Sequence, residues 1–122
     1  MSVLATPAVT QTFAALGDPI RSAIVEELTG GDATVGEIAA HFTITFQAVS
    51  QQITTLERAG LVTRHREGRS RRVHLERAPI EQASVWMEAR RLRLDERYRR
   101  LDHVLSDVLD VHTPPIPEEK RP

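Results

Sequence analysis

The 122-residue sequence predicts a mainly α-helical fold with one small β-hairpin. Three observations support this fold class. Apolar residues recur at helical spacing through residues 8–59 and again through 80–109. Valine, threonine and arginine gather on both sides of Gly68, as in two short strands around a turn. Glycine and proline separate these segments, so the sequence predicts several short helices, one hairpin and one long helix.

The first two helices are predicted from their ends. Residues 8–16 form the first helix, which Gly17 ends. Asp18 then caps the second helix, and Pro19 occupies its first position, where proline is favoured. The apolar residues of the second helix lie on one side: Ile20, Ile24, Val25 and Leu28.

A helix-turn-helix is predicted next. Thr34 and Glu37 have the spacing of a capping box and open a short helix over residues 35–42. Thr45 caps a helix over residues 46–59, whose core stripe is Val49, Ile53 and Leu56. The opposite face of this helix carries uncharged amides and hydroxyls, namely Gln47, Ser50, Gln51, Thr54 and Thr55. Such groups can donate to and accept from base edges, although a helical hairpin with a polar surface would show the same pattern.

The predicted hairpin, residues 61–77, is rich in arginine. Residues 45–77 contain seven arginines against three glutamates, a net charge of +4, whereas residues 1–44 carry −4 and residues 78–122 carry −1. Five arginines lie close together around the turn: Arg64, Arg66, Arg69, Arg71 and Arg72. So many cations indicate contact with a polyanion or an acidic partner on one face, the alternative being a solvated hairpin. A helix-turn-helix followed directly by such a hairpin is a winged helix.

A long helix is predicted within residues 78–110. Its later half has an apolar seam spaced four-three-four-three: Leu94, Tyr98, Leu101, Leu105 and Val108. Such a seam is typical of a helix that pairs with another helix. We expect pairing with a second copy, because a domain this small has little surface to cover so long a helix. Residues 1–7 are predicted to be a loose arm and residues 111–122, rich in proline, to be disordered.

Composition excludes several classes of protein. Forty per cent apolar and 27 per cent charged residues are typical of an ordinary globular domain. Cysteine is absent, which excludes disulfides and thiolate metal sites. The apolar runs are too short for a membrane span, and the first residues lack the pattern of a signal peptide, so we expect a cytoplasmic protein.

Several segments resemble the ArsR-type winged-helix transcriptional repressors. Residues 13–21 (FAALGDPIR) are similar to the segment that leads into the family's second helix. Residues 35–39 (VGEIA) resemble its first helix-turn-helix element, and residues 48–62 resemble its recognition helix and exit. Residues 66–69 (REGR) resemble the tip of its wing. The sequence departs from the family at Ile20 and at Gln51-Gln52, which we expect to affect the operator that is read.

The resemblance implies a homodimeric, sequence-specific DNA-binding regulator with dimerisation helices at both ends of the chain. Phe13 of the first helix would join the apolar seam at the dimer interface. Two recognition helices and two wings would address a palindromic operator. By position, the residues facing bases would be Thr45, Gln47, Ala48, Ser50 and Gln51, with Thr54 nearer the backbone. Arg69 would reach the minor groove, and Arg66 and Arg71 would lie near phosphates.

No cofactor, metal site or catalytic residue is predicted. Many relatives lose DNA affinity on binding a metal, but the sensing cysteines are missing here. Asp110 and His112 supply only half of a cysteine-free zinc site. No nucleophile with an adjacent base and no phosphate-binding loop stands out, so an enzyme is not expected. The alternative function is a winged-helix module that binds proteins. The sequence does not identify the operator or any inducer, and it does not distinguish repression from activation.

Overall fold

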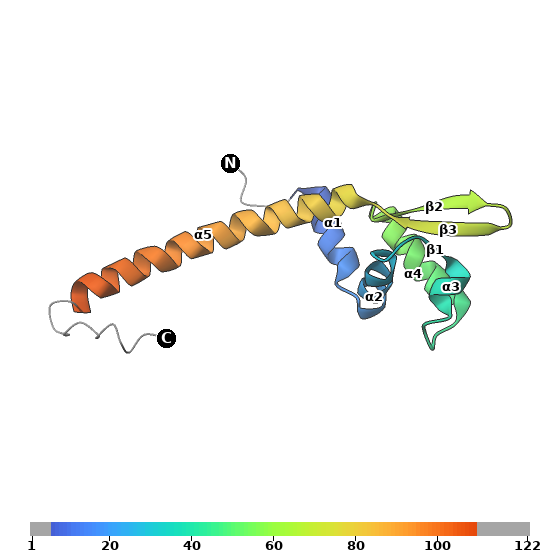
Figure 1. Cartoon of the computed structure of the whole chain (residues 1–122), viewed down its shortest axis with the longest axis horizontal. Coiled ribbons are helices and arrows are strands. Elements are labelled where there is room, and N and C mark those ends of the chain that lie inside the picture. The colour runs from blue at the N-terminus through green and yellow to red at the C-terminus, as the bar shows by residue number, and fades with distance from the viewer. Residues whose placement is uncertain (1–5, 110–122) are drawn as a thin grey trace. The chain divides into compact units, whose positions relative to one another are not determined.

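The computed structural model describes residues 6–109 and confirms the mainly helical fold with a small sheet (Figure 1). The elements are α1 (Pro7–Leu16), α2 (Pro19–Leu28), β1 (Ala33–Thr34), α3 (Val35–Ala39), α4 (Phe46–Arg58), β2 (Val62–Glu67), β3 (Ser70–Leu75) and α5 (Arg77–Leu109). The chain divides into two compact units that meet between Trp86 and Met87, within α5. The predicted disordered tail and most of the predicted arm lie outside the described residues.

Side-chain caps start the helices where the sequence predicts. The carboxylate of Asp18 accepts from the backbone N–H groups of residues 20 and 21, at 3.0 and 3.1 Å. The capping box of α3 is present in both directions, with Glu37 N to Thr34 Oγ1 at 3.1 Å and Thr34 N to Glu37 Oε1 at 2.9 Å. The backbone hydrogen bond from Thr34 lowers the pKa of Glu37. Thr45 caps α4 by accepting from Ala48 N at 3.0 Å.

Two local predictions need correction. The third helix ends at Ala39 rather than at residue 42, because the chain tightens into i to i−3 hydrogen bonds, His41 N to Ile38 O and Phe42 N to Ala39 O, both 3.1 Å. Phe42 nevertheless packs, partly buried, against the core. The structure also contains β1, a two-residue strand that the sequence does not predict and that pairs with β3. The sheet is therefore three-stranded and antiparallel, in the order β1-β3-β2.

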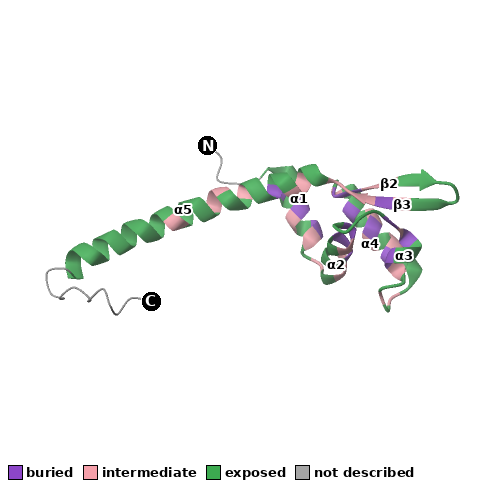
Figure 2. Cartoon of the chain, in the orientation of Figure 1, coloured by how far each residue is buried: buried purple, intermediate pink, exposed green. Residues whose placement is uncertain are grey.

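The core of the winged-helix unit lies between α2, α3, α4 and the base of the sheet (Figure 2). The predicted stripe of α4 is confirmed, since Val49, Ile53 and Leu56 are fully buried. Gly60 ends α4 with φ +81°, a left-handed conformation that a side chain would strain. The chain then enters the sheet through Leu61 and Val62, both buried.

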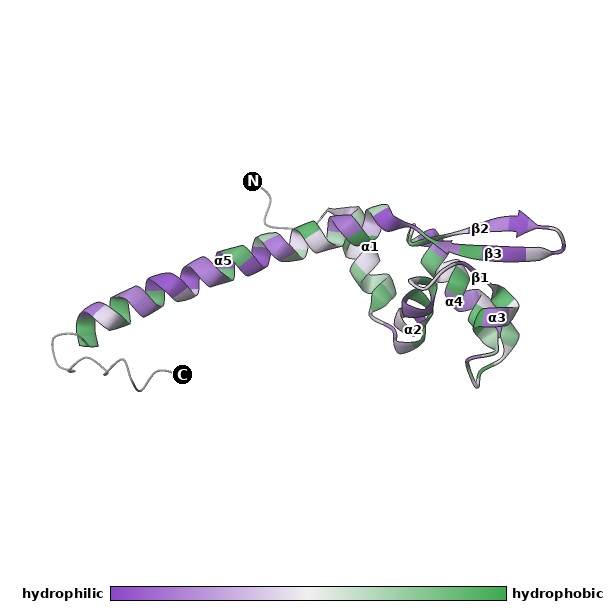
Figure 3. Ribbon diagram, viewed as in Figure 1, coloured by the Kyte–Doolittle hydropathy of each residue, from purple (hydrophilic) through white to green (hydrophobic). Residues whose placement is uncertain are grey.

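Helix α5 begins in this unit and continues beyond it. Within the first unit Ala83 is buried, and Trp86 packs edge-on against Phe13 of α1, with ring centroids 5.5 Å apart. From Met87 to Leu109 no residue is buried. Figure 3 shows hydrophobic residues recurring between hydrophilic ones along this part of the helix. No helix among the described residues is long and apolar enough to cross a membrane.

Candidate nucleic-acid interface

The outward face of α4 carries uncharged polar side chains. Thr45, Gln47 and Gln51 are exposed, while Ala48 and Ser50 are half-buried. The side chains of Gln47 and Gln51 make no hydrogen bond with another described residue. Their amides, on a helix whose other side is fixed in the core, are therefore available to an external partner.

Gln52 has a different role from its neighbour. Its Oε1 accepts from Arg21 Nη1 at 2.9 Å, and Arg21 Nε donates to Ala15 O at 2.8 Å. Arg21 thereby ties α4 to the end of α1 and the start of α2. The side chain of Gln52 therefore bonds within the chain, and its effect on which operator is read stays a prediction.

The hairpin alternates its side chains so that three arginines share one face. Gly68, with φ +60°, and Arg69 form a two-residue turn of the type II′ pattern between β2 and β3. Arg64 pairs with Val73 across the strands, and Arg66 pairs with Arg71. Because side chains alternate along a strand, Arg64, Arg66 and Arg71 lie on the face that buries Val73 against the core. This face of the wing is turned toward α4.

Arg64 joins the wing to α4. Its Nη2 donates to Ser50 O at 3.0 Å and to Thr54 Oγ1 at 2.9 Å. Its Nε lies 3.8 Å from Glu57 Oε1, close enough for charge attraction but too far for a hydrogen bond. Only 14% of the side chain is exposed. The Thr54 hydroxyl also donates to Ser50 O at 3.0 Å, so the group expected near a DNA backbone is engaged within the chain.

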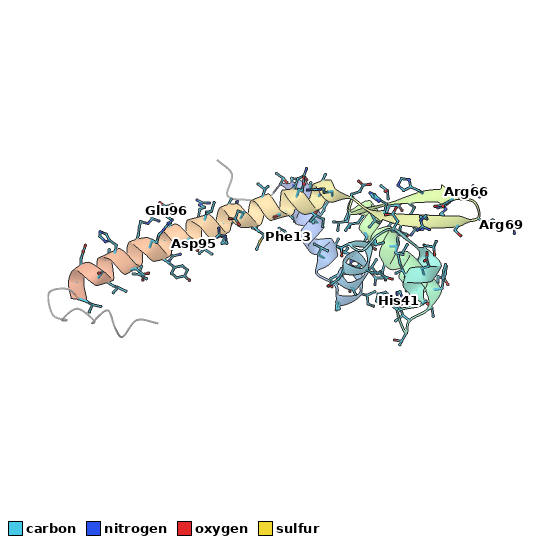
Figure 4. All side chains as sticks on the ribbon, in the orientation of Figure 1. Phe13, His41, Arg66, Arg69, Asp95 and Glu96 are labelled. Atoms are coloured by element: carbon cyan, nitrogen blue, oxygen red, sulfur yellow. The ribbon has the colours of Figure 1, made fainter. Side chains whose placement is uncertain are left out.

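Of the other four arginines of the wing, one has hydrogen-bonding or charged partners within the described chain and three do not. Arg72 lies 3.4 Å from the Glu67 carboxylate and donates to Asp32 O at 3.3 Å. Arg66, Arg69 and Arg71 are exposed and form no hydrogen bond or ion pair with any described residue. Figure 4 shows Arg66 and Arg69 at the outer end of the hairpin. The prediction that these five cations need a polyanion or an acidic partner is met by glutamates at Arg64 and Arg72, and an external polyanion stays the prediction for the other three.

A groove of about 530 Å³ separates the wing from the start of α4. Its lining includes Ser50 on one side and Arg69 and Arg71 on the other. Phe46 also lines it and is 58% exposed, unusual for an aromatic ring in a helix with a complete core stripe. No role was predicted for Phe46 from the sequence. Its spacing, three residues before Val49, places it in line with the core stripe, so the sequence pattern gives no signal of its exposure.

Two histidines of this unit, His41 and His74, are engaged with carboxylates. His74 Nδ1 lies 2.8 Å from Asp32 Oδ1, and this hydrogen bond raises the pKa of His74. His41 Nδ1 lies 2.5 Å from Glu27 Oε1. Within residues 6–109, no group of three or more His, Asp or Glu side chains is placed to hold a metal ion. Asp110 and His112 lie outside the described residues.

Comparison with known proteins identifies this architecture. A family described as a helix-turn-helix domain matches residues 16–65. The transcriptional repressor SdpR of Bacillus subtilis is 35% identical over 75 residues, which are 62% of this chain and 83% of SdpR. A solved ArsR family transcriptional regulator is 30% identical with a TM-score of 0.68, over 72% of this chain and 97% of that one. The chain belongs to the ArsR family.

A second solved structure agrees with this assignment. An ArsR-like regulator from Rhodococcus is 25% identical, with a TM-score of 0.69 over 80% of this chain and 92% of that one. As an ArsR-family protein, the chain is a DNA-binding regulator of transcription with a winged helix-turn-helix fold. Its relatives are regulators rather than enzymes.

Proposed function

We propose that this ArsR-family protein is a homodimeric repressor that reads a palindromic operator in the cytoplasm through α4 and the wing. The observation that carries the proposal is the division of the wing's arginines. Arg64 fixes the wing to α4, while Arg66, Arg69 and Arg71 are left without partners among the described residues. Free cations beside an uncharged recognition face match the two needs of DNA reading, phosphate attraction and base contact.

The exposed face of α4 supplies specificity in this proposal. Gln47 and Gln51 present amides that can bond bidentately to adenine, and Thr45 and Ser50 add hydroxyls. Ala48 allows close approach to the base edges. Arg69 at the turn reaches a minor groove, and Arg66 and Arg71 lie along phosphates. Thr54, expected nearer the DNA backbone, also holds Arg64.

Phe46 extends the reading surface toward the wing. Its exposed ring at the rim of the groove is suited to an apolar contact with a thymine methyl group. Replacing thymine by uracil at the contacted position should weaken binding of the wild type. The same replacement should leave a Phe46→Ala variant unaffected, and an equal decrease in both proteins would remove this role.

Dimerisation rests on Phe13 and the seam of α5. Leu94, Tyr98, Leu101, Leu105 and Val108 are all about half exposed in the single chain. Burying them against a second copy removes apolar surface from water and aligns two recognition helices on two half-sites. Leu101→Glu combined with Leu105→Glu should give monomers in sedimentation with unchanged helical content, and an intact dimer would exclude the seam.

A gel shift with a salt titration tests the DNA-binding proposal. The probe is the region upstream of the protein's own gene, and the control is a scrambled duplex of the same composition. We expect a sequence-specific shift that weakens steeply as the salt concentration rises. The reason is that arginines of the protein, on contacting phosphates, release the counterions condensed on the DNA, and added salt opposes this release. Absence of a shift at low salt would favour the alternative, a winged-helix module that binds a protein.

A further inference from the structure

An arginine that is already held in place lines the groove between α4 and the wing. Arg64 is one of the residues that line this groove, together with Ser50 of α4 and with Arg69 and Arg71 of the wing. Only 14% of the Arg64 side chain is exposed, whereas Arg69 and Arg71 are exposed and have no partner in the described chain. The groove therefore has one ordered cation beside two that are free.

The guanidinium of Arg64 has one edge left for a ligand. Both of its hydrogen bonds within the chain use Nη2, which donates to Ser50 O at 3.0 Å and to Thr54 Oγ1 at 2.9 Å. Nε is buried without a hydrogen-bond partner, and the Glu57 carboxylate lies 3.8 Å from it. Nη1 forms no hydrogen bond with any described residue. The donors of Arg64 that remain for a ligand are therefore those of Nη1.

The geometry of duplex DNA indicates what enters this groove. In the proposed function, α4 lies in a major groove of the DNA and the tip of the wing reaches the adjacent minor groove. One sugar–phosphate strand separates a major groove from the minor groove beside it. That strand must therefore pass between α4 and the wing, where the groove lined by Arg64 lies.

We propose that Arg64 binds a phosphate of this strand through Nη1 while Nη2 holds α4; this inference rests on the proposed DNA binding. A hydrogen bond from a guanidinium to a phosphate joins two charged groups, so it is stronger than one between neutral groups. Arg64 is ordered before DNA arrives, and it loses less conformational freedom on binding than an exposed arginine such as Arg69. One guanidinium thus positions the wing against α4 and both of them on the DNA strand.

Glu57 should weaken this contact. Its carboxylate lies beside Nε of the same guanidinium. The negative charge attracts Arg64, but it repels a phosphate bound to the other edge of Arg64. Glu57→Gln removes this repulsion and leaves Arg64 in place, so it should strengthen the contact with that phosphate.

Operators with single neutral phosphates test the contact. A methylphosphonate replaces one charged phosphate oxygen by a methyl group, and a set of operator duplexes carries one such group at each backbone position in turn. The full-length wild type should bind about tenfold more weakly when the group lies between the bases read by α4 and the minor groove reached by Arg69. In Arg64→Gln, the same replacement should weaken binding by less than about twofold, because the residue and the phosphate no longer interact.

Arg72→Gln is the matched control, because Arg72 lies in the same hairpin and is engaged with Glu67 and with the backbone of Asp32. This variant should keep the wild-type loss at that phosphate. If Arg64 acted only by holding the wing to α4, Arg64→Gln would bind every duplex more weakly and would keep the wild-type loss at that phosphate as well. Such a result would overturn the proposal and leave the repressor intact.

Glu57→Gln keeps the proposal testable if Arg64→Gln does not fold. Its loss at the same phosphate should exceed that of the wild type, because removing the carboxylate relieves repulsion only while the phosphate is charged. A loss equal to or smaller than that of the wild type would overturn the proposal. A wild type that shifts no operator at all would contradict the proposed function and this inference together, which separates that failure from the loss of the Arg64 contact alone.

Discussion

The winged-helix unit and the distal part of α5 use their apolar residues in opposite ways. In the winged-helix unit, Ile24, Ile38, Val49, Ile53 and Leu56 lie in a shared core and are almost fully buried. From residue 87 to 109, by contrast, apolar side chains are about half exposed and none is buried. The first region completes its burial within one chain, and the second is suited to burial against a partner.

Local interactions support the distal helix before it pairs. Arg91 bonds to both Glu88 and Asp95, and ion pairs spaced four residues apart join Arg100 to Glu96 and His103 to Asp107. Each such exposed pair stabilises the helix only slightly. The pairs favour helical conformation without burying the seam, so the apolar surface stays available to a second copy.

The same substitution in the two regions should therefore have different effects. Leu56→Ala opens a cavity in the core and should lower the free energy of unfolding by about 2–5 kcal/mol. Leu105→Ala should change the unfolding of the winged-helix unit by less than about 0.5 kcal/mol. If the protein is a dimer, its unfolding midpoint rises with protein concentration. Leu105→Ala should make this rise smaller, because the substitution weakens self-association.

Urea unfolding at several protein concentrations checks both outcomes. If Leu105→Ala lowers stability as much as Leu56→Ala at every concentration, the distal helix belongs to the same cooperative core and the contrast between the two regions fails.

A similar contrast exists within the wing, between an arginine that is hydrogen-bonded within the chain and one that is left available to a partner. Arg64→Ala removes two hydrogen bonds between the wing and α4 and should cost about 1–3 kcal/mol of stability. Arg69→Ala should leave stability unchanged, weaken binding to all DNA sequences alike and reduce the salt dependence by about one ion. Thermal unfolding and salt-titrated gel shifts measure the two effects. An Arg69→Ala variant that binds DNA as tightly as the wild type would exclude a wing contact.

Local signals in the sequence predicted most of the winged-helix unit. Asp18, Thr34 and Thr45 cap helices within three residues, and the stripe of α4 repeats over seven residues, so neither depends on distant parts of the chain. The strand β1 could not be predicted because two residues have no periodicity and form a strand only beside β3.

The partners of polar side chains were the harder part of the site. Arg64 reaches a residue 14 positions away and Gln52 is held by one 31 positions away, contacts that no local pattern encodes. The sequence therefore predicted a basic wing and a polar helix face, but it did not separate the residues that hold the fold from those left available. The DNA-facing and dimer-facing assignments themselves stay predictions.

The glutamines of α4 offer a second test of the difference between residues that hold the fold and residues that are available to DNA. Gln51→Ala or Gln47→Ala should each remove a hydrogen-bonding group from a base edge and relax base preference by about 1–3 kcal/mol, with little change in stability. Gln52→Ala, the matched control, removes the acceptor of Arg21 and should lower stability by about 0.5–1.5 kcal/mol without changing the preferred bases. Binding to a panel of single-base operator variants measures the preference. A change of preference in Gln52→Ala alone would reverse the roles assigned to these neighbours.

The smallest expected effect is a dependence of stability on pH at the base of the sheet. The hydrogen bond from Asp32 raises the pKa of His74 above its ordinary 6.5, so the folded state binds the proton more tightly than the unfolded state. The resulting stabilisation is complete below about pH 6.5 and is lost as the pH rises through the raised pKa. His74→Gln should remove this part of the decline in urea unfolding measured from about pH 5 to about pH 9. Asp32→Asn should flatten it as well, because the variant lacks the negative charge that favours the protonated imidazole. If the free energy of unfolding declined with rising pH in both variants as much as in the wild type, the titrating group would lie elsewhere. The contact between His74 of β3 and Asp32, in the loop before β1, would then contribute to stability through its geometry alone.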